Sequence, residues 1–119
     1  LASINNYEGD KMSVAEVNVD PGICGLKSKI TVEARDMMSA KVSIESDCPD
    51  IMKIGENIQE IDSMKDVFAK LGDSTIYQLG KEFCKHGTCP VPGAILKGVE
   101  VACGLALPKD VHVEILKKD

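Results

Sequence analysis

The chain has 119 residues, 44% of them hydrophobic and 28% charged, and a formal net charge of −5. This composition fits one folded domain and excludes an intrinsically disordered chain. The acidic balance offers no basic surface for nucleic acid or for an anionic membrane. No apolar run reaches the roughly 18 residues that a membrane-spanning helix needs, so we expect a cytoplasmic protein.

The polar first residues, 1–11, show no hydrophobic periodicity, and Met12 followed by Ser13 is typical of a natural start. They also lack the basic and apolar regions of a signal peptide. We expect a cloning remnant or a flexible arm over residues 1–11 and a single α+β domain over residues 12–119.

Three segments in the first half of the chain alternate apolar and polar residues: Val14–Val19, Lys29–Ala34 and Ala40–Glu45. This alternation is typical of strands with one buried face, and the short connections between them predict an antiparallel meander. A fourth alternating segment, Val111–Ile115, closes the chain. The sequence therefore predicts a small antiparallel sheet of three to four strands.

The middle of the chain has the periodicity of helices. After Pro49, isoleucines recur with the spacing of one helix face, at Ile51, Ile54, Ile58 and Ile61. Two short helices are predicted at Ser63–Leu71 and Ser74–Phe83, and the most apolar helix begins at Pro90. An apolar helix can cover one face of the sheet, so the predicted fold is α+β with helices packed on one face.

Five cysteines, without a secretion signal, favour metal ligands or reactive thiols over a disulfide framework. Cys48 and Cys89 each precede a proline that begins a helical pattern, so each falls at or near a helix N-terminus. Free N–H groups and the helix dipole stabilise a thiolate there, which lowers the pKa of the thiol. Cys24 lies in a Gly-rich turn, where the backbone can approach an ion. Cys103 lies on an apolar helix face and is predicted to be core.

The segment from Cys84 to Cys89 holds two thiols and the imidazole of His86 within six residues. Zinc and iron accept such mixtures of sulfur and nitrogen ligands. A buried cysteine is more often a small hydrophobic side chain, and His86 is equally consistent with a solvated loop residue. Two Cys-Pro sites together with a turn cysteine nevertheless favour a functional site.

The order of strands, helices and cysteines resembles the iron–sulfur cluster scaffold family of IscU and the N-terminal part of NifU. The matching positions are Cys24 with Gly25, Cys48 and Cys89, and the resemblance covers roughly residues 14–107. In that family these three cysteines hold the nascent cluster. The resemblance therefore implies an iron–sulfur cluster or zinc as the cofactor and cluster-assembly proteins as partners.

The chain departs from the family pattern at several positions. Leu26 follows Cys-Gly where the family has an acidic residue, and His86 lies three residues before Cys89 rather than beside it. The family's chaperone-binding segment is not recognisable in this chain, and Cys84 lies in the corresponding region. The closing segment Val111–Ile115 has no counterpart in the family. The pattern indicates a divergent relative.

Three functions remain open. The first is a metal- or cluster-binding protein with metal ligands Cys24, Cys48, Cys89 and either Cys84 or His86, which requires these residues to converge at one end of the sheet. The second is a thiol enzyme in which Cys48 or Cys89 is the nucleophile and His86 the base. The third is an interaction module whose cysteines only pack. Metal analysis of anaerobically purified protein separates the first function from the other two.

Overall fold

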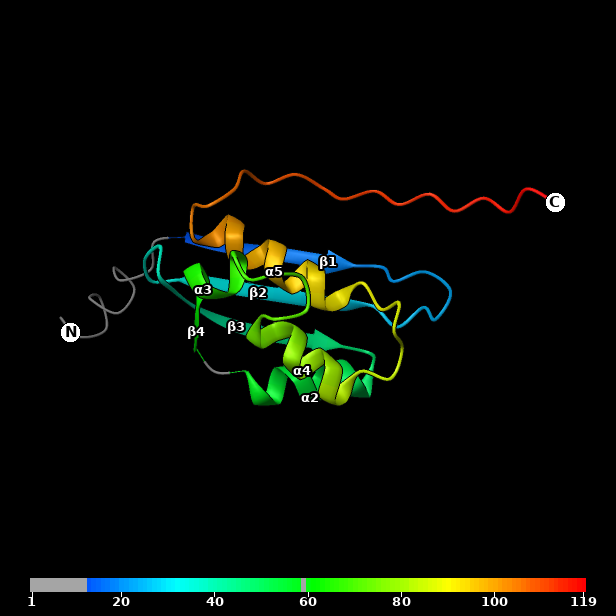
Figure 1. Ribbon diagram of the computed structural model, residues 1–119, viewed down its shortest axis with the longest axis horizontal. Coiled ribbons are helices and arrows are strands. Elements are labelled where there is room, and N and C mark those ends of the chain that lie inside the picture. The colour runs from blue at the N-terminus through cyan, green and yellow to red at the C-terminus, as the bar shows by residue number, and fades with distance from the viewer. Residues whose placement is uncertain (1–12, 59) are drawn as a thin grey trace.

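The computed structural model describes residues 13–58 and 60–119, so the expectation for residues 1–11 lies outside the described part. The strands are β1 (Ser13–Val19), β2 (Ser28–Ala34), β3 (Ser39–Ser46) and β4 (Glu60–Asp62). The helices are α2 (Pro49–Asn57), α3 (Ser63–Val67), α4 (Thr75–Phe83) and α5 (Val91–Ala102). Figure 1 shows their arrangement.

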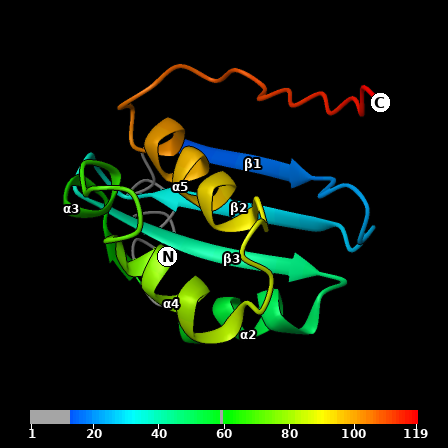
Figure 2. The ribbon, with the colours of Figure 1, turned by 45° about the vertical axis from the view of Figure 1, so that its right-hand side comes forward.

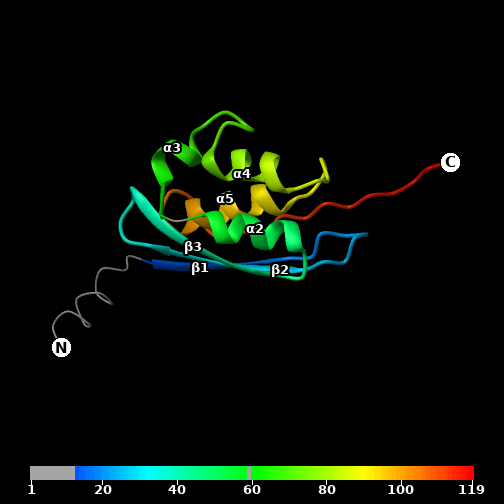
Figure 3. The same cartoon turned by 90° about the horizontal axis from the view of Figure 1, so that it is seen from below.

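The strands form one four-stranded antiparallel sheet in the order β1-β2-β3-β4. Short connections join β1 to β2 and β2 to β3, as the alternating segments predicted. All the helices lie on the same face of this sheet (Figure 3). The predicted α+β fold, with a small antiparallel sheet and helices packed on one face, is therefore confirmed.

The core lies between the inner face of the sheet and the helices. Alternate residues of β2 point inward, and Ile30, Val32 and Ala34 are fully buried. Helix α5 packs against β1 and β2, while α2 packs against β3 (Figure 2). Because the chain has few aromatic residues, this core consists mainly of isoleucine, valine and alanine.

Gly98 sets how closely α5 approaches the sheet. A Cβ atom at this position would lie 2.8 Å from Val17 Cγ2 and 3.1 Å from Val32 Cγ2. A side chain here would force the helix away from both strands, because packed cores have little free volume. The glycine therefore fixes the spacing between α5 and the β1–β2 pair.

Two element predictions were wrong. Val111–Ile115 forms no strand, and the fourth strand is Glu60–Asp62, which pairs with β3. The first helix ends at Asn57 because Ile58 is extended, with φ −86° and ψ 129°, so Ile61 lies on β4 instead of a helix face. A strand of three residues is too short to show an alternation of apolar and polar residues. The isoleucines before and after the end of α2 also keep the spacing of a helix, so the sequence predicted one continuous helix.

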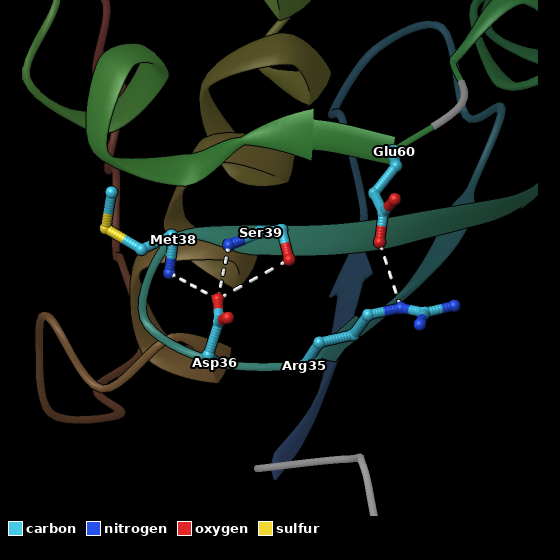
Figure 4. Close-up of polar contacts among 5 residues, drawn as sticks. All are labelled: Arg35, Asp36, Met38, Ser39 and Glu60. Atoms are coloured by element: carbon cyan, nitrogen blue, oxygen red, sulfur yellow. Dashed lines mark hydrogen bonds and ion pairs between the residues drawn. The ribbon is translucent and has the colours of Figure 1, made fainter. Parts of the chain in front are cut away.

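The hairpin between β2 and β3 is held by the side chain of Asp36 (Figure 4). Its Oδ1 atom accepts hydrogen bonds from the backbone N–H groups of Met38 at 2.7 Å and Ser39 at 2.9 Å. An ion pair of 2.9 Å between Arg35 Nε and Glu60 Oε2 connects the same hairpin to β4. These contacts explain why residues 35–39 form a tight link.

A buried carboxylate connects α3 to α4. Asp66 is 2% exposed, and its Oδ1 atom accepts hydrogen bonds from the backbone N–H of Thr75 at 3.2 Å and from its hydroxyl at 3.1 Å. These bonds anchor the first residue of α4 to α3. They therefore help to fix α4, the helix that Cys84 caps at its C-terminus.

Replacing Asp66 with alanine is expected to lower the free energy of unfolding by about 2 kcal/mol, because the Thr75 N–H and hydroxyl lose their buried acceptor. The variant Asp66→Asn keeps a carbonyl oxygen at this position and should lose less. Chemical denaturation of the two variants checks the prediction. An alanine variant as stable as the wild type would show that these hydrogen bonds contribute nothing.

Candidate thiol site

Three chain connections meet at one end of the sheet. Because the sheet is antiparallel, the end of β1, the start of β2 and the end of β3 are neighbours, and Val19 pairs with Ser28, which pairs with Ser46. The connection between α4 and α5 lies at this same end (Figures 1 and 2). The β1–β2, β3–α2 and α4–α5 connections carry Cys24, Cys48 and the segment 84–89 respectively.

Cys48 is the N-cap residue of α2, as predicted from the proline that follows it. Its backbone N–H donates to Ser46 Oγ at 3.0 Å, and Ser46 Oγ in turn lies 2.8 Å from Ser28 Oγ. Its thiol makes no capping hydrogen bond and is partly buried against the core. Ser46, supported by Ser28, therefore holds the Cys48 backbone, and the Cys48 sulfur does not cap the helix.

The segment 84–89 folds back on itself around the carbonyl of His86. That carbonyl accepts a hydrogen bond from the backbone N–H of Cys89 at 3.1 Å and a weak one from Cys84 Sγ at 3.7 Å. Cys84 is also fixed as the C-cap of α4, since its backbone N–H donates to Gly80 at 2.8 Å. The two ends of the segment, each with a thiol, are therefore brought together.

The pKa of the Cys89 thiol is raised from 9.0 to about 11, and burial is the largest cause. A hydrogen bond with the thiol of Cys84 contributes to this rise, as do the nearby charges that Cys84 and Cys48 carry when ionised. The backbone N–H of Val91, at the start of α5, acts in the opposite direction. Cys84 and Cys48 are therefore close enough to affect the ionisation of Cys89, although Cys48 comes from a distant part of the sequence.

The expectation of a lowered pKa was wrong for Cys89. The predicted helix N-terminal effect is present, because the N–H of Val91 stabilises the thiolate. Removal of the thiol from water has the larger effect, since burial penalises the charged form. The sequence shows where a helix begins but not how deeply the residue before it is buried.

The other sequence-predicted residues have different surroundings. Cys24 is exposed in a turn closed by a 2.9 Å hydrogen bond from Gly25 N–H to Gly22 O, and it is not among the residues that shift the pKa of Cys89. His86 is exposed and contributes its backbone carbonyl to the segment. Cys103 is fully buried in the core, as predicted.

Cysteine thiols are suitable ligands for a thiophilic metal ion, but the thiols are not arranged as a preformed metal site. Within residues 13–58 and 60–119, no three His, Cys, Asp or Glu side chains are placed to hold a metal ion as they stand. Thiolates on one zinc ion lie about 2.3 Å from the metal and hence within about 4 Å of one another. The cysteines would therefore have to move closer together to hold a metal ion.

A cleft of about 540 Å³ lies at the ends of β1, β2 and β3, and no cysteine is among its lining residues. Its lining includes Ser28 and Ser46, which support Cys48, and charged residues of both signs such as Lys27 and Asp47. Sequence reasoning missed both serines. The only signal was their position at the inward-facing strand ends, where an apolar residue would continue the pattern.

The stability of the metal-free protein is expected to fall as the pH rises from 9 to 11. The unfolded chain releases the Cys89 proton near pH 9.0, whereas the folded chain keeps it until about pH 11. The unfolded state binds fewer protons in this window, so rising pH favours unfolding, and below pH 9 the contribution is fully present. Denaturation across this range should show a shallower decline for Cys89→Ala. Equal slopes for the variant and the wild type would contradict the raised pKa.

Comparison with known proteins gives one family match. The model of a family of unknown function (DUF6951) matches residues 15–115, a stretch that includes every cysteine of the chain. No curated protein and no solved structure matches the chain significantly. Among the described residues, no helix has the length and apolar character that crossing a membrane requires.

Proposed function

We propose that this chain, which belongs to the DUF6951 family, binds a thiophilic metal ion or an iron–sulfur cluster through Cys48, Cys84 and Cys89. The observation that supports the proposal is that Cys84 and Cys48, from two other helix ends, both lie close enough to Cys89 to raise the pKa of its thiol. They come from the N-terminus of α2, the C-terminus of α4 and the residue before the N-cap of α5. Hydrophobic packing alone does not require Cys48 and Cys84 to lie within electrostatic reach of Cys89.

The chemistry of the three thiols suits a cation. Each cysteine that becomes a ligand loses one proton and supplies a thiolate. Without a cation, ionisation of Cys84 or Cys48 makes ionisation of Cys89 harder. A bound divalent ion replaces this repulsion with attraction, so metal affinity should increase as the pH rises through the neutral range.

Cys24 is the fourth ligand in this proposal. Its turn lies at the same end of the sheet as the other connections, and its side chain is exposed (Figure 1). Gly22 and Gly25 have φ angles of +98° and +70°, which side chains rarely adopt, so the turn depends on both glycines. Three partly buried thiols with one exposed thiol make a site that opens on one side, as exchange of a metal or cluster requires.

The resemblance to IscU and NifU supports the cluster over a single zinc ion and supports cluster-assembly proteins as partners. The role of Cys84 differs from the sequence expectation of a choice between Cys84 and His86. Cys84 interacts with Cys89, whereas the His86 side chain is exposed. We therefore favour Cys84 over His86 as a ligand.

The alternative of a thiol enzyme with Cys89 as its nucleophile is less well supported, whereas Cys48 as the nucleophile stays an open alternative. A nucleophilic cysteine needs a substantial thiolate fraction at neutral pH, and a pKa of about 11 leaves Cys89 almost entirely protonated. The same property does not oppose metal binding, because a metal ion displaces the proton from a coordinating thiol.

Anaerobic loading of the purified protein tests the proposal. The protein is incubated with zinc, or with ferrous iron and sulfide, and passed through a desalting column before elemental analysis. We expect about one zinc ion or one cluster per chain, together with protection of Cys24, Cys48, Cys84 and Cys89 from alkylation. Metal-free protein with all four thiols still reactive after loading would contradict the proposal.

A further inference from the structure

The chain leaves the body of the protein after α5. Leu105 and Ala106 are still attached, because their N–H groups donate to Glu100 O at 2.8 and 3.2 Å. Residues 107–119 then form neither helix nor strand, and within the described residues they make no backbone hydrogen bond. Figures 1 and 2 show this segment as an extended stretch that runs along the β1 side of the protein without joining the sheet, and its far end reaches beyond the sheet and helices.

The sequence of this segment is that of a strand with one apolar face. Val111, Val113 and Ile115 alternate with His112 and Glu114. The three apolar side chains are 63%, 74% and 87% exposed. The family match runs to residue 115, so this pattern belongs to the part of the chain that the family model describes. An alternating apolar segment with an unpaired backbone lacks the partner strand for which it is suited.

The sheet offers an open edge that matches such a segment. In the order β1-β2-β3-β4, β1 has no neighbour on its outer side among the described residues. Gly98 of α5 packs against Val17 of β1, and Ala94 and Val101 lie on the same side of α5, four residues before and three after Gly98. Both side chains are only partly buried. The outer edge of β1 therefore has partly exposed apolar residues of α5 above it.

We propose that residues 109–117 of one copy add as a strand to the β1 edge of a second copy, and that the exchange is reciprocal. Backbone hydrogen bonds would pair the segment with β1, as in strand addition at other open sheet edges. Val111, Val113 and Ile115 would cover Val17 and Val101, while His112 and Glu114 would face solvent. A reciprocal exchange uses the same two surfaces twice and gives a closed, twofold-symmetric dimer.

The course of the segment favours the β1 edge of a second copy, and not that of its own chain, as its pairing partner. After α5 the chain does not pair with its own β1, although β1 lies directly under the helix (Figures 1 and 2). Pro108 restricts the backbone at the point where the segment begins and favours an extended chain there. The backbone groups of the segment, which make no hydrogen bond with the chain's own β1, are therefore available to the β1 edge of another molecule.

The oligomeric state of the full chain tests the proposal. Sedimentation equilibrium should show a dimer for the wild type, and Val113→Lys should weaken dimerisation by about a hundredfold, because a charge would enter an apolar interface. The matched variant His112→Lys places the same residue at the neighbouring, outward-facing position and should leave the dimer intact. Circular dichroism should show the same fold for both variants.

Hydrogen exchange separates the second copy from the chain's own edge. Amides of residues 111–115 should be protected in the dimer and should lose protection as the protein is diluted into monomer. Protection in a monomer would place the segment on its own β1 edge and overturn the proposal. A wild type that stays monomeric at about 100 μM, or a His112→Lys variant as disruptive as Val113→Lys, would also overturn it.

Discussion

Replacing Cys89 with serine is expected to weaken zinc binding at least 100-fold and to prevent an iron–sulfur cluster from surviving desalting. The thiols of both Cys84 and Cys48 affect the pKa of Cys89, so Cys89 is the proposed ligand that lies near the other two. Changes to residues that only orient a ligand already reduce metal affinity by roughly 10–100-fold, and loss of a ligand should cost at least that much. Competition with a chromophoric chelator measures the affinity of each variant.

The matched control is Cys103→Ala. Cys103 is a fully buried cysteine of the hydrophobic core, and it is not one of the proposed ligands. This variant should lose some stability, because a buried side chain becomes smaller, yet it should bind zinc with wild-type stoichiometry. Cys48→Ser and Cys84→Ser should resemble Cys89→Ser. If Cys89→Ser and Cys103→Ala bound equally well, Cys89 would not be a ligand.

Replacing Gly98 with valine is expected to lower the free energy of unfolding by about 3 kcal/mol. The Cβ atom alone would lie 2.8 Å from Val17 Cγ2, and the two methyl groups would add to the overlap with β1 and β2. Overpacking of this kind costs roughly 1–3 kcal/mol in well-packed cores, with larger values where the backbone must shift. Because Cys89 precedes α5, a shift of this helix should also weaken metal binding.

Lys97→Val is the control for the effect of valine on the helix itself. Lys97 is the neighbouring, exposed residue of α5, with an ion pair to Glu100 at 3.8 Å. Valine there should cost less than about 1 kcal/mol, from helix propensity and the loss of this surface pair. Urea denaturation compares the two variants. Equal stabilities would mean that α5 does not depend on a glycine at its contact with the sheet.

The sequence predicted most of the sheet because each long strand has its own period of two. Residues 14–19, 29–34 and 40–45 lie within the observed strands β1, β2 and β3. The period could not identify Glu60–Asp62, whose strand character comes only from pairing with β3. The same alternation wrongly predicted a strand at Val111–Ile115, because alternation shows that a segment can pair but not that a partner strand is present.

The candidate site was partly predictable, because the positions of two cysteines follow from local sequence patterns. The Cys-Pro pattern placed Cys48 at the N-cap of α2 and Cys89 directly before that of α5. The pKa of Cys89 was not predictable, since it depends on burial and on thiols contributed by other connections. The contact between Cys84 and Cys89 depends on the fold of the segment around His86 O. The resemblance to IscU and NifU stays a prediction.

X-ray absorption spectroscopy of the zinc-loaded protein tests the central claim most directly, because it identifies the atoms bound to the metal. We predict a first shell of three or four sulfur atoms at about 2.3 Å. Serine at Cys89 should remove one sulfur from this shell or prevent loading. A shell of nitrogen and oxygen atoms alone, near 2.0–2.2 Å, would contradict a thiolate site formed by Cys48, Cys84 and Cys89.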